Sequence, residues 1–250
     1  MFKYFDIIYQ DKDILVIYKP AGLIVESDKK LVLDTDRGSD LTLEKILVED
    51  YKINLPRGGI VHRLDRDTSG LMVIAKNEKA LVNLQNQFAS RSVKKVYQAL
   101  VFGKIEPKKG TINIALKRDP KNRTRFVASK SKEAREAITK YEVIPRLNLG
   151  VPPEVQPRDR DLKAKTTFLK INLETGRTHQ IRAHFYAIGY PVVGDQVYKS
   201  RDSEIFSKKI GLKRQFLHAS ELSFKHPTTG KKMDFKSELP EDLRRLGLVG

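Results

Sequence analysis

The segment from Gly58 to Gly70, Gly-Gly-Ile-Val-His-Arg-Leu-Asp-Arg-Asp-Thr-Ser-Gly, concentrates side chains that could do chemistry. Asp65 follows His62 and Arg63 and precedes Arg66, and nearby cations favour the ionised form of a carboxyl group. An ionised carboxylate can act as a nucleophile or as a general base. Glycines at both ends indicate a tight loop of specific shape. The segment predicts a catalytic loop, with a surface turn and a local ion pair as the alternative.

A second segment, residues 173–182, has the pattern of a strand, a glycine turn and the start of a helix. Arg177, His179 and Arg182 follow the turn, and a helix N-terminus behind a glycine turn is a ready anion site. The alternative is an ordinary capped helix, with Thr178 as its N-cap.

A third segment places Tyr97 in an expected strand, directly after the lysine pair Lys94-Lys95 and a valine. A tyrosine beside cations can stack on an unpaired RNA base. Taken alone, a strand tyrosine is more often part of the packing.

Several other chemistries fit the sequence poorly. The absence of cysteine excludes thiol catalysis, iron–sulfur clusters and thiolate zinc sites, and it fits a reducing compartment. There is no His-Glu-x-x-His, no Gly-x-Ser-x-Gly and no Walker loop. A metal site on His62, Asp65 and Asp67 would be opposed by Arg63 and Arg66. Nothing would make one of the two aspartates an acid and the other a base, as a glycosidase requires.

The charge of the chain indicates a polyanionic partner. Lys and Arg number 48 against 31 Asp and Glu, a formal net charge of +17 over 250 residues. Residues 91–135 alone hold 14 basic residues against three acidic ones. Self-repulsion on this scale costs stability unless a polyanion uses it, and phosphate backbones are the obvious candidate. An anionic membrane surface ranks lower, because the sequence shows no long amphipathic basic helix with an aromatic face.

Hydrophobic patterns predict the elements that must position these residues. Strands are expected at 14–18, 70–75, 93–102 and 166–173, and helices near 41–48, at 78–89 and at 178–188. The alternation within 166–173 predicts one buried face. Gly189 is expected to end the last helix, with His179 and Arg182 on its polar side. Strands dominate, which favours an α+β fold on a largely antiparallel or mixed sheet.

Together the segments resemble the RluA-type RNA pseudouridine synthase family over nearly the whole chain. The catalytic block of the family is similar to 62–71, and its tyrosine block is similar to 95–101. Further blocks are similar to 11–23, 176–184, 194–198, 217–219 with 226–227, and 239–240. The resemblance implies a mixed, mostly antiparallel sheet with flanking helices and a central active-site cleft. It also implies an isomerase that converts uridine to pseudouridine with no metal or organic cofactor.

The resemblance also implies roles for individual residues. Asp65 matches the essential aspartate, and Arg182 matches the arginine that pairs with it. Tyr97 matches the tyrosine that packs on the target base, and Arg63 the arginine that fills the stack left by the flipped uridine. The expected RNA-binding residues are His62, Arg63, Arg66, Thr68, Arg177 and His179. Phe185 stands where the family usually has leucine, and Leu23-Ile-Val-Glu26 stands where it often has a His-Pro pair.

Further expectations concern organisation and partners. Residues 1–250 are expected to form one catalytic domain, with a loop insertion at 146–165 and without the small RNA-binding domain that precedes it in many relatives. The expected partner is ribosomal or transfer RNA, the expected compartment the cytoplasm, and the expected state a monomer, since no apolar surplus indicates an interface. A non-catalytic RNA-binding or ribosome-assembly factor is the main alternative, and a carboxylate–metal nuclease is a third.

Overall fold

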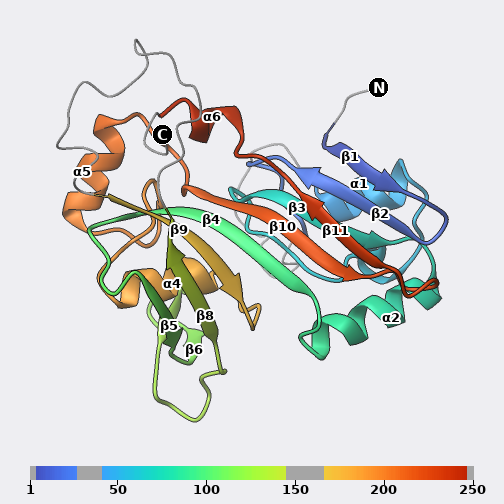
Figure 1. The fold of residues 1–250 in the computed structure, drawn as a ribbon, viewed down its shortest axis with the longest axis horizontal. Helices are drawn as coiled ribbons and strands as arrows, with labels where there is room; N and C mark the ends of the chain where they lie inside the picture. The colour runs from blue at the N-terminus through green and yellow to red at the C-terminus, as the bar shows by residue number, and fades with distance from the viewer. Residues whose placement is uncertain (1–3, 27–40, 145–165, 247–250) are drawn as a thin grey trace. The chain divides into compact units, whose positions relative to one another are not determined.

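The computed structural model describes residues 4–26, 41–144 and 166–246, drawn as a coloured ribbon in Figure 1. The chain divides into two compact units. The first unit comprises residues 1–94 and 221–237, and the second comprises 95–220 and 238–250. The insertion expected at 146–165 lies outside the described residues. A single catalytic domain over the whole chain stays a prediction.

The first unit is built on antiparallel strands and short helices. Its strands are β1 (Asp6–Gln10), β2 (Ile14–Lys19), β3 (Ser69–Ala75), the second half of β10 (Leu217–Lys225) and β11 (Lys232–Lys236). β2 pairs with β1 on one side and β3 on the other, and β10 pairs with β11. Its helices are α1 (Leu43–Glu49), the 3-10 helix η1 (Pro56–Gly59) and α2 (Glu78–Ala89).

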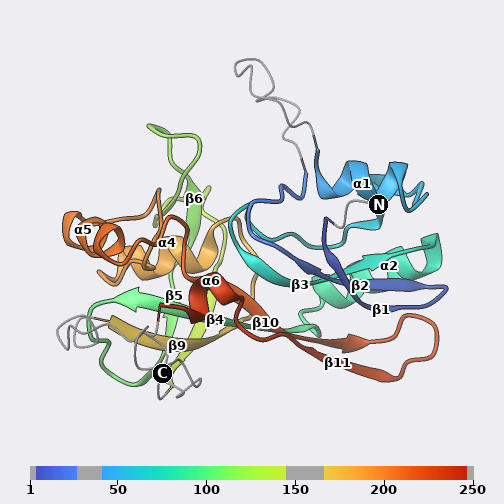
Figure 2. The same ribbon diagram turned by 90° about the horizontal axis from the view of Figure 1, so that it is seen from above.

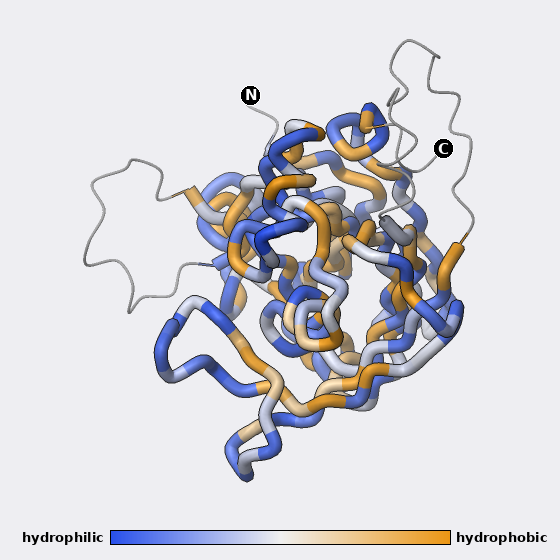
Figure 3. Tube along the Cα trace, turned by 90° about the vertical axis from the view of Figure 1, so that its left-hand side faces the viewer, coloured by the Kyte–Doolittle hydropathy of each residue, from blue (hydrophilic) through white to orange (hydrophobic). Residues whose placement is uncertain are grey.

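The core of this unit lies between β3 and α2. Every residue of β3 is buried. Figure 3 colours the chain by hydropathy, with hydrophobic stretches in orange and hydrophilic ones in blue. Leu81 and Leu84 on α2 pack into the same cluster as Leu71 and Val73. Burying each such side chain contributes about 1.5–3 kcal/mol. The Asn77 side chain accepts a hydrogen bond from the Ala80 amide and fixes where α2 begins.

The second unit is also built on antiparallel strands. Its strands are β4 (Lys94–Phe102), β5 (Lys109–Asn113), β6 (Leu116–Arg118), β7 (Phe126–Ala128), β8 (Ile138–Val143) and β9 (Thr166–Leu173), with the first half of β10. β4 pairs with β9, β9 with β8 and β8 with β5, while β6 and β7 form a separate hairpin. Its helices are α4 (Gln180–Ala187), α5 (Arg201–Lys209) and α6 (Glu241–Arg244). In Figure 2 the β6–β7 hairpin stands beside α4.

The observed elements confirm the predicted α+β class. The ladders named above are antiparallel, and one isolated bridge, between Ile24 and Thr42, is parallel. Among the described residues, no helix is long and apolar enough to cross a membrane. Gly189, with φ +85°, directly follows Ile188, the C-cap of α4, as predicted. Phe185, expected to be a tolerated core variation, is fully buried with its ring edge-on to Tyr141.

Three local predictions are wrong. Thr178 is not the N-cap of α4, because His179 occupies that position in the left-handed region (φ 55°) and α4 begins at Gln180. Arg182, predicted on the polar side of the helix, is instead buried at 5% exposure, where it forms an ion pair with a carboxylate inside the fold. Strand β9 buries both faces in its first half, where Thr167 and Phe168 are both buried.

Candidate active site

The loop that carries Asp65 begins with a glycine pair pressed against β3. Gly58 and Gly59 have φ of +59° and +77°, a region that side chains disfavour. A Cβ at Gly59 would lie 2.0 Å from the carbonyl oxygen of Ala75. Ile60 then forms an antiparallel bridge with Ile74. The glycines are therefore required for the loop to start this close to the buried strand.

Asp65 lies on a turn that is anchored on both sides. Leu64 and Thr68 are buried, and the Thr68 amide donates to the Asp65 carbonyl oxygen at 3.1 Å. The carbonyl oxygen of Arg66 accepts from the Gly22 amide and from Lys19 Nζ, both at 2.9 Å. Asp65 itself is half-buried. The turn thus presents one partly accessible carboxylate from a backbone that has little freedom to move.

Lys19 is the anchor that sequence reasoning missed. It is fully buried at the end of β2, and its ammonium group donates to the carbonyl oxygens of Pro20 (2.7 Å), Leu23 (3.0 Å) and Arg66 (2.9 Å). Lysine is almost never fully buried unless its charge is satisfied. Its place in Lys-Pro-Ala-Gly after an apolar strand was visible in the sequence, but nothing there showed that its partners are backbone oxygens.

The arginines of this loop are exposed. Arg63, with 46% of its side chain exposed, has Nη1 3.9 Å from Glu26 Oε2, and Arg57 donates to the same carboxylate. Arg66 is 67% exposed, with Nε 3.8 Å from Asp67 Oδ1. Exposed ion pairs of this kind contribute little, typically about 0–1 kcal/mol. Arg63 and Arg66 are therefore available to a larger anion at small cost.

His62 is tied into the fold on its Nε2 side. Its Nε2 accepts a hydrogen bond from the Val73 amide at 3.1 Å, and its ring stacks on Phe88 with centroids 4.7 Å apart. An accepting Nε2 carries no proton, so the network assigns the proton of the neutral ring to Nδ1. His62 therefore holds the loop on β3 and α2, and its expected contact with RNA stays a prediction.

In the second unit, Tyr97 and Lys95 lie on β4. Tyr97 is opposite Ile171 of β9 and is 8% exposed. Lys95 Nζ lies 3.5 Å from the position a Cβ would take at Gly176, the glycine of the turn before α4. Burial lowers the pKa of Lys95. The tyrosine and lysine of this block therefore sit in a mainly buried part of the strand.

Gln180 organises the turn that leads into α4. Its side-chain oxygen accepts from the Thr175 hydroxyl and the Arg177 amide, at 2.8 and 2.9 Å. Its side-chain nitrogen donates to the Ile138 carbonyl and to Thr139 Oγ1, both at 3.0 Å. Arg177 Nε donates to the carbonyl oxygen of Glu136. Because the buried side-chain amide of Gln180 forms hydrogen bonds through both its oxygen and its nitrogen, it fixes the path of the chain past Arg177 and His179.

Arg182 projects from α4 into a buried ion pair. Its Nε and Nη2 donate to Asp195 Oδ2 and Oδ1 at 2.6 and 3.0 Å, and the two side chains are 6% and 0% exposed. Asp195 Oδ1 also accepts from the amides of Val197 and Tyr198. Bidentate, charge-assisted bonds of this kind fix the plane of the guanidinium group. Asp195 was visible in the sequence but received no role there.

The candidate residues fall into two groups. His62, Arg63, Asp65, Arg66 and Thr68 belong to one loop of the first unit. The remaining four belong to the second unit and are Tyr97, Arg177, His179 and Arg182. The pairing of Asp65 with Arg182 stays a prediction.

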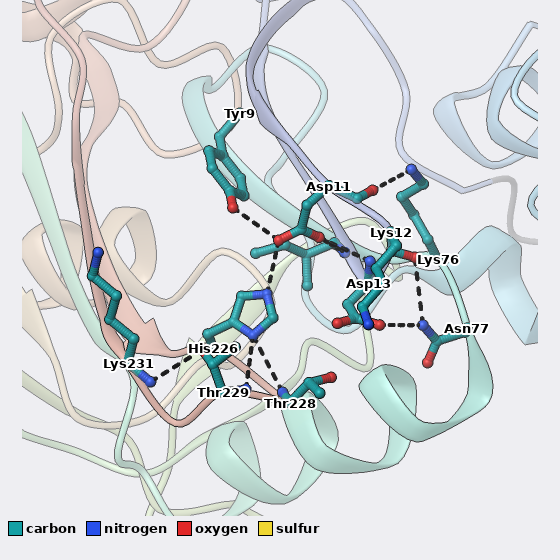
Figure 4. A network of polar contacts seen from close by, with 11 residues as sticks. Tyr9, Asp11, Lys12, Asp13, Lys76, Asn77, His226, Thr228, Thr229 and Lys231 are labelled. Atoms are coloured by element: carbon teal, nitrogen blue, oxygen red, sulfur yellow. Dashed lines mark hydrogen bonds and ion pairs between the residues drawn. The ribbon is translucent and has the colours of Figure 1, made fainter.

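A separate polar cluster in the first unit joins the β1–β2 turn to the β10–β11 turn (Figure 4). Asp11 Oδ2 contacts His226 Nε2 and accepts from the Tyr9 hydroxyl, both at 2.8 Å. The amides of Thr228 and Thr229 donate to His226 Nδ1, so that nitrogen carries no proton and Nε2 is the donor to Asp11. The cluster ties together two turns that are far apart in the sequence.

The same cluster is the one group of potential metal ligands among the described residues. Asp11, Asp13 and His226 bring ligand atoms within 4.8 Å of one another. However, both ring nitrogens of His226 are engaged, and Asp13 Oδ1 accepts from Asn77 Nδ2 at 2.8 Å. A metal would have to displace hydrogen bonds that hold the turns, so these contacts are interpreted as structural.

Comparison with known proteins identifies the family of the chain. A family model described as RNA pseudouridylate synthase matches residues 13–187. An uncharacterized RNA pseudouridine synthase of Aquifex aeolicus is 39% identical over 241 residues, which cover 96% of this chain and 71% of that protein. Ribosomal large subunit pseudouridine synthase D of Pseudomonas aeruginosa is 38% identical over 244 residues, which cover 95% and 69%.

A solved structure of a pseudouridylate synthase domain is similar to this chain at lower sequence identity. Human RNA pseudouridylate synthase domain containing 1 superposes with a TM-score of 0.68 at 26% identity, covering 94% of this chain and 84% of that one. The fold and the matched sequence define a pseudouridine synthase. The chain belongs to the RNA pseudouridylate synthase family and is an isomerase that acts on RNA.

Proposed function

We propose that this enzyme isomerises specific uridines of structured RNA, with ribosomal RNA as the first candidate substrate and transfer RNA as the second. Relatives 38% identical to this chain are named ribosomal large subunit pseudouridine synthase D. The net charge of +17 supports a polyphosphate substrate of either kind.

The proposed reaction needs one carboxylate at the sugar. The N1–C1′ bond breaks, the base rotates, and a C5–C1′ bond forms; C5 loses its proton and N1 gains one. Nothing is oxidised and no water is consumed. Asp65 either attacks C1′ as a nucleophile or removes a proton from C2′ as a base. The observation that carries this assignment is the anchored turn, which fixes the Asp65 backbone through Lys19, Gly22 and Thr68.

The other candidate residues support access to the base. A uridine in a helix must flip out before its C1′ can be reached, which costs a few kcal/mol. We propose that Tyr97 packs on the flipped base and that Arg63 fills the vacated stack. Arg182 is proposed to pair with the Asp65 carboxylate and to orient it. His62, Arg66, Thr68, Arg177 and His179 are proposed to contact the RNA around it.

Mapping of pseudouridine tests the function and identifies the substrate. The purified protein is incubated without added metal with unmodified ribosomal RNA and, separately, with unmodified transfer RNA, each in the absence and in the presence of EDTA. New pseudouridine at defined positions of one RNA supports the proposal and names the substrate. Tight binding to both RNAs with no product would favour the alternative of a non-catalytic assembly factor. Product that disappears on addition of EDTA would contradict the metal-free mechanism.

A further inference from the structure

Tyr198 lies at the centre of a buried junction between α4 and the β6–β7 hairpin. Its side chain is among the largest fully buried ones, at 1% exposure. Its hydroxyl accepts a hydrogen bond from the Phe126 amide of β7 at 2.7 Å and lies 3.2 Å from His179 Nδ1. Burial raises the pKa of Tyr198 to about 12, so the hydroxyl keeps its proton at neutral pH and can donate it to the imidazole. One hydroxyl therefore joins the hairpin to the start of α4.

Two arginines lie against the same ring. The Arg182 and Arg125 guanidinium carbons are 5.2 and 5.3 Å from the centre of the Tyr198 ring. Such cation–π contacts are strongest where the cation is desolvated. Arg125 is also 5.4 Å from the ring of Tyr186, and within the described residues its buried Nε has no hydrogen-bond partner. The aromatic rings of Tyr198 and Tyr186 thus hold the side chain of Arg125, the hairpin residue next to Phe126.

The hairpin itself is strongly basic and well placed to meet an anion. Residues 116–128 contain five basic side chains and one acidic side chain. Arg118, Lys121 and Arg123 near its tip are exposed. Tyr198 makes two of the contacts that hold this hairpin beside α4, because the Phe126 amide bonds to its hydroxyl and Arg125 packs on its ring. Ring contacts of Phe126 with His179 and of Arg125 with Tyr186 add to them.

We propose that Tyr198 is a positioning residue with two separable parts: its hydroxyl docks the β6–β7 hairpin for RNA binding, and its ring orients Arg182 for catalysis. The proposal rests on the proposed function for the role of Arg182 and of RNA. The backbone supports the second part, since the Tyr198 amide bonds to the same Asp195 that holds Arg182. RNA contacts at the hairpin and the placement of the catalytic arginine would then depend on one buried side chain.

Two substitutions separate the parts, and a third is the control. Tyr198→Phe removes the hydroxyl and keeps the ring, whereas Tyr198→Leu removes both. Tyr141→Phe removes the hydroxyl of another mainly buried tyrosine of the second unit, a hydroxyl that donates to the Pro107 carbonyl at 3.4 Å. Each variant is measured for kcat and KM on the substrate RNA and for the rate of trypsin cleavage within residues 116–128, with circular dichroism as the check on folding.

The proposal predicts different outcomes for the variants. Tyr198→Phe raises KM and the rate of cleavage in the hairpin about three- to tenfold, the effect of one lost hydrogen bond, and leaves kcat within twofold. Tyr198→Leu also lowers kcat about 100-fold, the effect of a misplaced catalytic group. Tyr141→Phe changes none of the three.

Two results would overturn the proposal. One is a Tyr198→Phe variant whose hairpin cleavage and KM match those of Tyr141→Phe. The other is a fall in kcat that is as large in Tyr198→Phe as in Tyr198→Leu. Failure of the proposed function would look different, because the wild type would then form no pseudouridine while the cleavage rates still decided whether the hydroxyl docks the hairpin.

Discussion

Replacement of Lys19 by methionine should loosen the turn that carries Asp65. Methionine keeps the apolar stem within the buried site and removes the ammonium group. The carbonyl oxygens of Pro20 and Leu23 then lose the donor on Lys19, while that of Arg66 keeps the Gly22 amide. An unsatisfied buried polar group costs about 1–3 kcal/mol, so two of them give a loss of about 2–6 kcal/mol in the free energy of unfolding.

The loss should be visible both in stability and in turnover. Equilibrium unfolding in urea, followed by circular dichroism, measures the free energy. Turnover should fall about 100-fold in kcat, because a misplacement of about 1 Å at a reacting group can have that effect. Lys79→Met, at an exposed position on α2, is the matched control and should stay within about 0.5 kcal/mol of the wild type. A Lys19→Met variant that loses less than about 1 kcal/mol and keeps its kcat would refute the anchoring role.

Two further predictions concern the first unit. Gly59→Ala should cost about 3 kcal/mol in the free energy of unfolding, because its Cβ would meet the Ala75 carbonyl. The control Gly230→Ala, also at positive φ but with no atom within 4 Å of the added Cβ, should cost about 1 kcal/mol. Equal losses would contradict the close approach of Gly59 to Ala75. Burial alone would raise the pKa of Asp11, but hydrogen bonds from the Ile14 and Asp13 amides, the Tyr9 hydroxyl and His226 lower it from 3.8 to about 2. A lowered pKa stabilises the fold above pH 3.8, and that stabilisation is lost as the pH falls towards 2. Asp11→Asn should therefore remove about 1–2 kcal/mol of acid dependence, after allowance for solvent screening, and an unchanged acid unfolding curve would count against the network.

Sequence patterns predicted the helices and strands whose bounds follow from local hydrophobic periodicity. The helix at 78–89 was predicted to the residue, because Leu81 and Leu84 have helical spacing, and Asn77 caps its start in the structure. Strand β9 was predicted with the same bounds, since its alternation is regular. The burial of both faces in its first half was not predicted, because the residues that cover Phe168, among them Phe216, come from a distant part of the chain.

The candidate site was predicted less completely, because the residues that support it also come from distant parts of the chain. The side chains that could react lie within short segments; their types indicated a reactive carboxylate, and the family resemblance supplied the reaction. Their supports come from elsewhere: Lys19 reaches the Arg66 carbonyl across 47 residues, and Arg182 reaches Asp195 across 13. Neither contact follows a helical or strand period. The N-cap of α4 was missed because His179 takes it in the left-handed region and without a side-chain cap bond, which the usual preference for Ser, Thr, Asn or Asp does not predict.

The central claim is that the Asp65 carboxylate carries the reaction, and it is tested most directly by turnover of Asp65→Asn. Substrate RNA labelled with tritium at C5 of uridine releases the label when pseudouridine forms. Asp67→Asn, which changes another carboxylate of the same turn, is the control. The account predicts at least about a 100-fold loss for Asp65→Asn, with RNA binding and the unfolding midpoint unchanged, and near-normal release for Asp67→Asn. Release by Asp65→Asn at the rate of the control would contradict it.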